Sequence, residues 1–117
     1  MSLEYVSGTE FILANDSILI FILNTDELPG STRVIIYQDG GGGGVVFADT
    51  GVLNVTPTAS VAIGASSLNT GFFWLKIFAS SRDLVPNVHF VRLQGGQPVI
   101  FSSYSPGDFA VFERSRR

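Results

Sequence analysis

The chain has 117 residues and a formal net charge of −3 at pH 7, with ten acidic and seven basic side chains. Cysteine is absent, which excludes a disulfide-stapled miniprotein, a thiolate metal site and a cysteine nucleophile. Charged residues make up 15% of the chain, against roughly 25% in a typical soluble domain. We therefore expect a single domain over 1–117 that hides part of its apolar surface in a homo-oligomer.

The charge distribution argues against several partners. Three of the seven basic residues lie at positions 114, 116 and 117, and the chain through Phe112 has four basic against nine acidic residues. Because this acidic body has no basic stripe, we expect no nucleic-acid partner. No apolar run reaches the length of a membrane-spanning helix. The first residues lack a basic signal-peptide region, so a cytoplasmic location is the default expectation.

The first strongly patterned stretch is 17–24. Segment 5–13 predicts one entering strand or two short pieces, and Asn15-Asp16 has turn chemistry. Residues 18–23 are apolar without a break, and three of the six are β-branched, which favours a strand. A strand that is apolar on both sides must be covered on both sides. We expect a central strand with one face on the core and the other under a second layer or a partner subunit.

The middle of the chain is punctuated by turn residues. The Pro29-Gly30 turn predicts a hairpin between the strand at 17–24 and a strand at 32–38. A glycine run, Gly40 to Gly44, follows. It lacks the Lys, the hydroxyl residue and the following helix of a phosphate-binding loop, so it is interpreted as a loop between strands. Further short strands are expected at 45–47, 52–55 and 60–63.

The second strongly apolar strand is 71–78. Its alternation places Phe73, Leu75 and Ile77 on one side and Phe72, Trp74, Lys76 and Phe78 on the other. We expect the Phe73 face in the core and the Trp74 face at a partner surface or at its rim. A Gly95-Gly96 hairpin should join strands at 88–93 and 98–101, with Pro86 at an edge or first position. A Pro106-Gly107 turn should precede the last strand, 109–112.

These elements predict the fold class. Gly, Pro, Asn and Asp recur every eight to twelve residues, and no window has a helical apolar period over three turns. This pattern is typical of an all-β protein, an antiparallel β-sandwich of about eight to ten short strands with no substantial helix.

No stretch carries a recognisable chemistry. His89 is the one histidine and lies among apolar residues on a predicted strand, so we predict no catalytic, cofactor-binding or metal-binding residues. The acidic residues of predicted turns lack the spacing of a calcium loop. The candidate interface or ligand surface is aromatic and consists of Trp74, Phe72, Phe78, Tyr37 and Tyr104.

One segment resembles a known family. Ile22-Leu23-Asn24-Thr25, followed by Arg33-Val34-Ile35-Ile36-Tyr37 and Asp39-Gly40, is similar to the start of several bacterial β-sandwich families. Of these, it resembles the sensory rhodopsin transducer-like family of small oligomeric β-sandwich proteins. The resemblance covers about a fifth of the chain and implies a sandwich that forms an oligomer.

Three functions stay open on the sequence alone. The first is a non-enzymatic sandwich that self-associates through an apolar sheet face and has a structural or protein-interaction role. The second is a small-ligand or carbohydrate-binding module that exposes Trp74, Tyr37 or Tyr104 in a groove. The third is an enzyme, which requires His89 to converge with acidic residues in a pocket.

Overall fold

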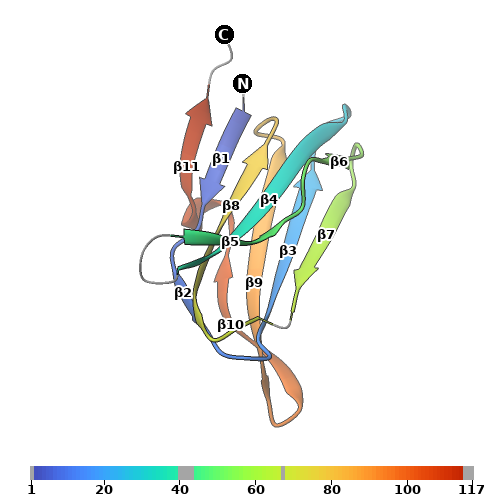
Figure 1. Ribbon diagram of the computed structural model, residues 1–117. Coiled ribbons are helices and arrows are strands. Elements are labelled where there is room, and N and C mark those ends of the chain that lie inside the picture. The colour runs from blue at the N-terminus through green and yellow to red at the C-terminus, as the bar shows by residue number, and fades with distance from the viewer. Residues whose placement is uncertain (1, 40–43, 67, 115–117) are drawn as a thin grey trace.

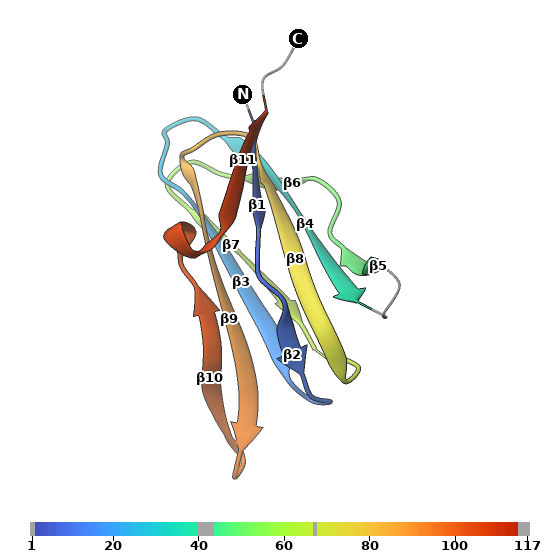
Figure 2. The ribbon, with the colours of Figure 1, turned by 90° about the vertical axis from the view of Figure 1, so that its left-hand side faces the viewer.

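The computed structural model describes residues 2–39, 44–66 and 68–114 (Figure 1). These residues form two antiparallel sheets packed face to face, as the side view shows (Figure 2). The all-β sandwich is therefore confirmed. The described residues contain eleven strands, more than the eight to ten expected, because two strands are only three residues long. Four residues of the glycine run, Gly40 to Gly43, lie outside the described residues.

Sheet A is the larger of the two sheets. Its strand order is β11-β1-β8-β4-β5, with β2 paired to β8 and β6 paired to β4. The strands are β1 (Ser2–Val6), β2 (Glu10–Ile12), β4 (Gly30–Asp39), β5 (Gly44–Asp49), β6 (Leu53–Val55), β8 (Gly71–Ala79) and β11 (Ala110–Arg114).

Sheet B has the order β10-β9-β3-β7. Its strands are β3 (Ser17–Asn24), β7 (Ser60–Ala65), β9 (Leu84–Gln94) and β10 (Gln97–Tyr104). A short 3-10 turn, η1 (Pro106–Asp108), carries the chain from β10 back to sheet A. Among the described residues, no helix is long and apolar enough to cross a membrane.

The core lies between the two sheets and follows the predicted alternation. Ile18, Ile20 and Ile22 of β3 are fully buried, and so are Phe73 and its inward neighbours Leu75 and Ile77 on β8. All belong to one apolar cluster that includes residues of both sheets. The expectation that the Phe73 face lies in the core is confirmed.

The expected hairpin between 17–24 and 32–38 is wrong. β3 pairs with β7 and β9 in sheet B, whereas β4 belongs to sheet A. The Pro-Gly segment therefore crosses between the layers. The buried Asn24 side chain holds this crossing, because its Nδ2 donates to Leu28 O at 2.9 Å and to Val55 O at 3.1 Å. Its Oδ1 accepts from Asp26 N at 2.9 Å.

The expected β9–β10 hairpin is confirmed. Gly95 and Gly96 have φ values of 59° and 80°, as the two central positions of a type I′ turn require. Pro86 occupies the third position of β9. The pairing of β10 with β9 ends at Val88, so Pro86 has a neighbouring strand only on the β3 side. The N–H that proline lacks therefore interrupts no hydrogen bonds on the β10 side of the strand.

A buried ion pair fixes the turn that leads into β3. Asp16 is 2% exposed, and its Oδ2 accepts from Leu13 N at 2.9 Å. Arg92 of β9 donates from Nε and Nη2 to both carboxylate oxygens. Burial alone would raise the pKa of Asp16, but the hydrogen bonds from Arg92 and Leu13 outweigh it, so the pKa lies below its ordinary value. The charged form of Asp16 therefore stabilises the folded chain.

We expect Asp16→Ala to lower the free energy of unfolding by about 2 kcal/mol, because it removes the buried carboxylate that accepts hydrogen bonds from Arg92 and from Leu13 N. Arg82→Ala, which removes an exposed pair with Glu113, should cost less than about 1 kcal/mol. Urea titration measures the loss of stability in both variants. Equal losses in the two variants would contradict the assignment of a stabilising role to the Asp16–Arg92 pair.

The same pair predicts a pH effect. Since the pKa of Asp16 is lowered on folding, the stability that the charged carboxylate contributes is present above pH 3.8 and is lost as pH falls through the folded value.

Candidate interaction surfaces

The outer face of sheet A carries most of the predicted aromatic surface. Phe72, Trp74 and Phe78 of β8 point away from the core. In the register between β8 and β4, Trp74 lies beside Tyr37 and Phe78 lies beside Arg33. Phe72 packs edge-to-face against Phe11, with ring centroids 5.1 Å apart.

Trp74 and Tyr37 form a stacked pair. Their ring centroids lie 4.2 Å apart with an interplanar angle of 12°. The Lys76 ammonium lies 5.7 Å from the Tyr37 centroid and 5.8 Å from the Trp74 centroid. A Cβ atom at Gly44 would come within 3.3 Å of Trp74 and 3.4 Å of Tyr37. The two rings therefore cover one another and are further screened by Lys76 and the β5 backbone.

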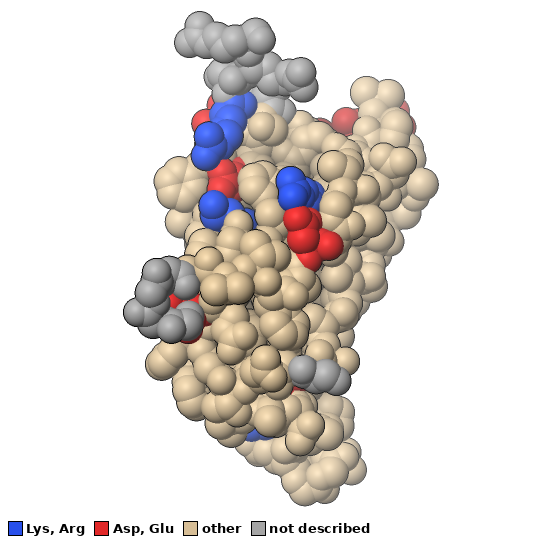
Figure 3. All heavy atoms as spheres, in the orientation of Figure 1, with Lys and Arg blue, Asp and Glu red and all other residues tan. Residues whose placement is uncertain are grey.

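The charges on this face are paired within the protein. Glu4 of β1 is 4% exposed, and Lys76 Nζ lies 3.3 Å from its Oε1 while Arg114 Nη2 lies 2.9 Å from its Oε2. Burial alone would raise the pKa of Glu4, but its hydrogen bonds to Arg114 and Lys76 keep the pKa below the ordinary value. In the orientation of Figure 1, most of the visible charged atoms lie in a few spots of the upper half, with smaller patches lower down (Figure 3).

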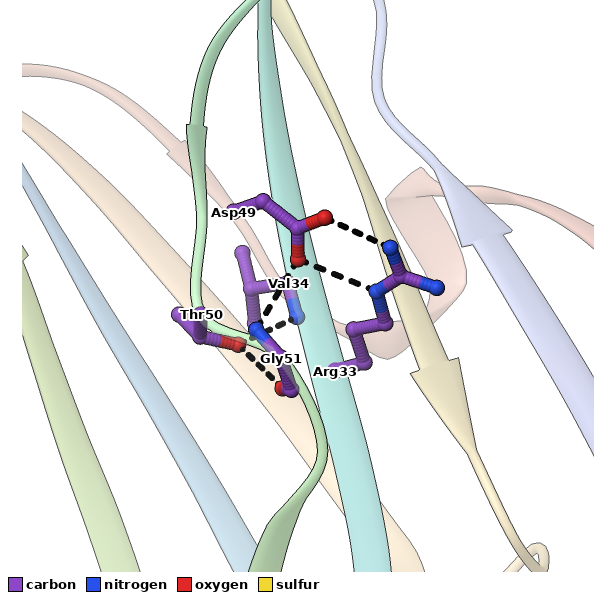
Figure 4. Close-up of polar contacts among 5 residues, drawn as sticks. All are labelled: Arg33, Val34, Asp49, Thr50 and Gly51. Carbon is purple, nitrogen blue, oxygen red and sulfur yellow. Dashed lines mark hydrogen bonds and ion pairs between the residues drawn. The ribbon is translucent and has the colours of Figure 1, made fainter.

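A second ion pair, between Arg33 and Asp49, lies at the turn that follows β5 (Figure 4). Arg33 Nε donates to Asp49 Oδ1 at 3.0 Å, and Nη2 donates to Oδ2 at 2.5 Å. Gly51, at a φ of 67°, donates its N–H to Asp49 Oδ1, and Val34 N donates to Thr50 Oγ1. The Arg33 and Gly51 bonds lower the pKa of Asp49 to about 2.

The Arg33 side of this turn borders an open cavity of about 330 Å³. It is lined by Arg33, by the Phe78 ring and by the hydroxyl residues Ser2, Ser31 and Ser80, among others. Arg33 is committed to Asp49, and Ser80 Oγ accepts from Ser31 N at 2.9 Å. The one charged side chain among the described residues that line this cavity is thus already paired within the protein.

The outer face of sheet B is different in kind. Leu19, Phe21 and Leu23 alternate with the buried isoleucines of β3, and they are 39%, 38% and 43% exposed. All residues of the four strands are described, and Arg92, which is bonded to Asp16, is the one Asp, Glu, Lys or Arg among them. The outer face of sheet B therefore carries no charged side chain, and its polar side chains include Asn87 and His89, which lie opposite Phe21 and Leu19.

On its β7 side, β3 has no neighbours that cover these side chains. Ser60, Ala62 and Gly64 of β7 lie opposite Leu23, Phe21 and Leu19. Each is small, so the β3 side chains stand above the β7 surface, beside the edge of the sheet. Elsewhere in sheet B, Leu93 of β9 and Ile100 of β10 are 59% and 56% exposed.

The histidine also lies on this face. On β9, His89 lies opposite Leu19, and its ring is 6.0 Å from the Phe21 ring. Its Nδ1 atom is buried and has no hydrogen-bond partner. No group of three or more His, Asp or Glu side chains in the described residues could hold a metal ion.

Tyr104 lies apart from the other predicted aromatic residues. It belongs to β10, and its ring packs against Phe90 and Phe109 with centroids 6.0 Å and 5.4 Å away. Its hydroxyl donates to Glu10 Oε2 at 2.6 Å. Burial, followed by the hydrogen bond to Glu10, raises the pKa of Tyr104 to about 12. The side chain thus ties sheet B to β2 of sheet A.

The structure brings four of the five predicted surface residues together: Trp74, Phe72, Phe78 and Tyr37 share the outer face of sheet A. The more uniform apolar surface lies on the other sheet, around Leu19, Phe21 and Leu23. Its signal in the sequence was the unbroken apolar run of 18–23. The small residues of β7 beside that run carried no signal of their own.

Comparison with known proteins supports the fold. No family model and no curated protein matches the chain. The crystal structure of Thermotoga maritima 1070 is similar, with a TM-score of 0.64 over 87% of this chain and 90% of that chain, at 9% sequence identity. At this identity the likeness bears on the sandwich fold alone.

The Tyr104–Glu10 bond predicts a pH effect. Because folding raises the pKa of Tyr104 from 10 to about 12, the stability linked to its neutral form is present below pH 10 and is lost between pH 10 and about 12. At pH 8, Tyr104→Phe should be less stable than wild type by about 1 kcal/mol. Thermal unfolding from pH 8 to 12 should show this difference shrinking. A difference that stays constant would argue against the assignment.

Proposed function

We propose that the protein is a non-enzymatic β-sandwich module that self-associates through the outer face of sheet B. One observation carries the proposal: β3 is apolar on both sides, and only the side of Ile18, Ile20 and Ile22 is covered by the described chain. Apolar surface that stays in contact with water costs roughly 25 cal/mol per Å² relative to buried surface. A partner that covers Leu19, Phe21 and Leu23 would remove that cost.

A second copy of this chain is the partner that suits this surface. A two-fold contact brings the same patch of both subunits together. Since no charged side chain of the four strands faces outward from sheet B, such a contact would bury no unpaired charge and would oppose no like charges. The low charged fraction of the chain and its resemblance to an oligomeric sandwich family support the same choice.

The outer face of sheet A is less suited to this role. Glu4, Lys76 and Arg114 form one paired group on it, and Arg33 and Asp49 form another. A partner seated there would have to desolvate these charges.

The alternative function is binding of a carbohydrate or another small ligand by the aromatic residues of sheet A. Phe72 is half-exposed and would be available to a sugar ring. However, Trp74 and Tyr37 each present one ring face to the other, and Tyr104 belongs to a separate cluster. The enzyme alternative has less support, because His89 Nδ1 lacks the hydrogen-bonded partner that orients a catalytic histidine.

We expect wild-type protein to be oligomeric by light scattering at tens of micromolar, and Leu19→Lys to shift the mass downward. The lysine would place a charge in the middle of the proposed contact, at a position where the side chain is already partly in water and the fold is spared. Association should weaken at least tenfold, which is about 1.4 kcal/mol. Phe72→Lys, at a side chain of sheet A that is 50% exposed against 39% for Leu19, is the control and should leave the mass unchanged.

The two variants separate the possible outcomes. A wild-type monomer across the dilution series would overturn the proposal. A mass that falls with Phe72→Lys and not with Leu19→Lys would move the contact to the aromatic face of sheet A. Circular dichroism and thermal unfolding of both variants establish that any loss of mass is not a loss of fold.

A further inference from the structure

Besides the three-residue strands β2 and β6, which pair with β8 and β4 and are very short, the two strand orders have four ends. Three of these four ends are protected against pairing with another strand. β10 has Pro98 and a register shift between Ile100 and Ser102. β11 carries Glu113 and Arg114, and the pairing of β5 with β4 has a register shift at Ile36/Tyr37. Proline, charge and bulges are the devices by which proteins keep edge strands from pairing with other chains.

The fourth end, β7, has none of these devices. Its sequence, Ser60-Val61-Ala62-Ile63-Gly64-Ala65, contains no proline and no charge. Its pairing with β3 runs over six consecutive residue pairs without a register shift. In Figure 1, β7 lies at the right-hand side of the molecule with no strand beyond it. β7 therefore presents a regular edge of backbone donors and acceptors.

The register identifies which backbone groups face outward. Asn24 N donates to Ala59 O at 2.9 Å, which makes Asn24 and Ala59 a hydrogen-bonded pair of the antiparallel ladder. Such pairs recur every second residue, so Val61, Ile63 and Ala65 bond to β3. The N–H and C=O groups of Ser60, Ala62 and Gly64 consequently point away from the sheet.

We propose that β7 pairs with β7 of a second copy in an antiparallel register centred on Ala62. This register places Ala62 opposite Ala62 of the partner subunit and Ser60 opposite Gly64 of the partner subunit. Each of the three outward residues then donates and accepts one bond, which gives about six backbone hydrogen bonds. Displacing the register in either direction leaves one of the three residues without an outward-facing counterpart in the strand.

The inward side chains of β7 support the same contact. Val61 and Ile63 pack against the core but are only partly buried, because the sandwich is open at this edge. In the proposed register each Val61 lies opposite an Ile63 of the other copy. Directly opposed side chains of antiparallel strands lie close enough to pack, so pairing would extend the core across the two-fold axis.

The edge contact also explains how the proposed face contact gains sufficient area. Four strands about 4.8 Å apart and about 24 Å long offer roughly 450 Å² per subunit, or about 900 Å² in total, slightly below the ~1,000 Å² expected of a biological interface. Edge pairing joins two B sheets into one continuous eight-stranded sheet, whose uncharged face is about twice as large. The edge contact does not need the face contact, so the two can be tested separately.

Single-cysteine variants test the register, because the natural chain has no cysteine. Opposed residues of a hydrogen-bonded pair have Cα atoms about 5.5 Å apart, within the reach of a disulfide. Ala62→Cys should therefore cross-link to a covalent dimer under mild oxidation. Ser60→Cys is the matched control on the same face of the same strand, since its two copies would lie about 14 Å apart, an offset of four residues.

We expect Ala62→Cys to cross-link at least tenfold faster than Ser60→Cys. A mixture of Ser60→Cys and Gly64→Cys proteins should form the mixed disulfide. Gly64 can accept the change, because an added Cβ would meet only a Leu19 methyl group, at an ordinary 3.8 Å. Equal rates for Ala62→Cys and Ser60→Cys, or no covalent dimer from Ala62→Cys, would overturn the register.

Two further variants separate the edge from the face. Ala62→Pro removes an outward N–H that the β3–β7 ladder does not use, so it should reduce the mass while circular dichroism stays unchanged. Leu19→Lys in the Ala62→Cys background should still cross-link, because it disturbs the face and leaves the edge intact. An Ala62→Pro protein that is folded and keeps the wild-type mass would refute the edge contact without touching the proposed face contact.

Discussion

The two sheets depend on one apolar cluster, in which the isoleucines of β3 are buried together with the inward side chains of β8. Ile18, Ile20 and Ile22 are fully buried in the cluster that also contains Phe73 and Leu75. Each side chain removed from water in this way contributes roughly 1.5–3 kcal/mol. Because both strands lie in the interior of their sheets, this cluster fixes how the two sheets pack and so where the edge strand lies that carries the proposed copy-to-copy contact.

The same strand creates the surface problem that the proposed association solves. The two-residue period that buries Ile20 necessarily turns Leu19 and Phe21 outward. A strand with polar residues on its outer side would have given the same core and a water-compatible face. The chain instead carries apolar residues there, and the neighbouring strand β7 carries residues too small to cover them. The excess of apolar surface is thus concentrated on one sheet.

Sequence reasoning captured the elements better than their arrangement. Strand 17–24, the inward side of Phe73 and the Gly95-Gly96 turn followed from local rules, namely alternation, β-branching and positive φ. The hairpin after 17–24 was wrong because a Pro-Gly segment signals a reversal but not the sheet that the chain enters next. That choice depends on contacts between distant segments, such as the bond that Asn24 Nδ2 donates to Val55 O.

Prediction of the candidate surfaces from the sequence was limited in the same way. Alternation placed Phe72, Trp74 and Phe78 on one face, but it could not show that Tyr37 would cover Trp74, since that requires the β4–β8 register. Tyr104 carried no signal that separated it from them, because its partners Phe90, Phe109 and Glu10 come from three different segments.

The edge of β7 shows why an absence of features can carry information once a fold is known. In the sequence, Ser60 to Ala65 is an unremarkable short strand, because proline and charge have meaning only at a strand known to end a sheet. After the strand order identifies the four sheet ends, the contrast becomes specific: three carry protecting features and one carries none. An unprotected edge beside an uncovered apolar face exposes a protein to uncontrolled association. Pairing with a defined copy would satisfy both surfaces at once, because it caps the edge and enlarges the face that a second pair can cover.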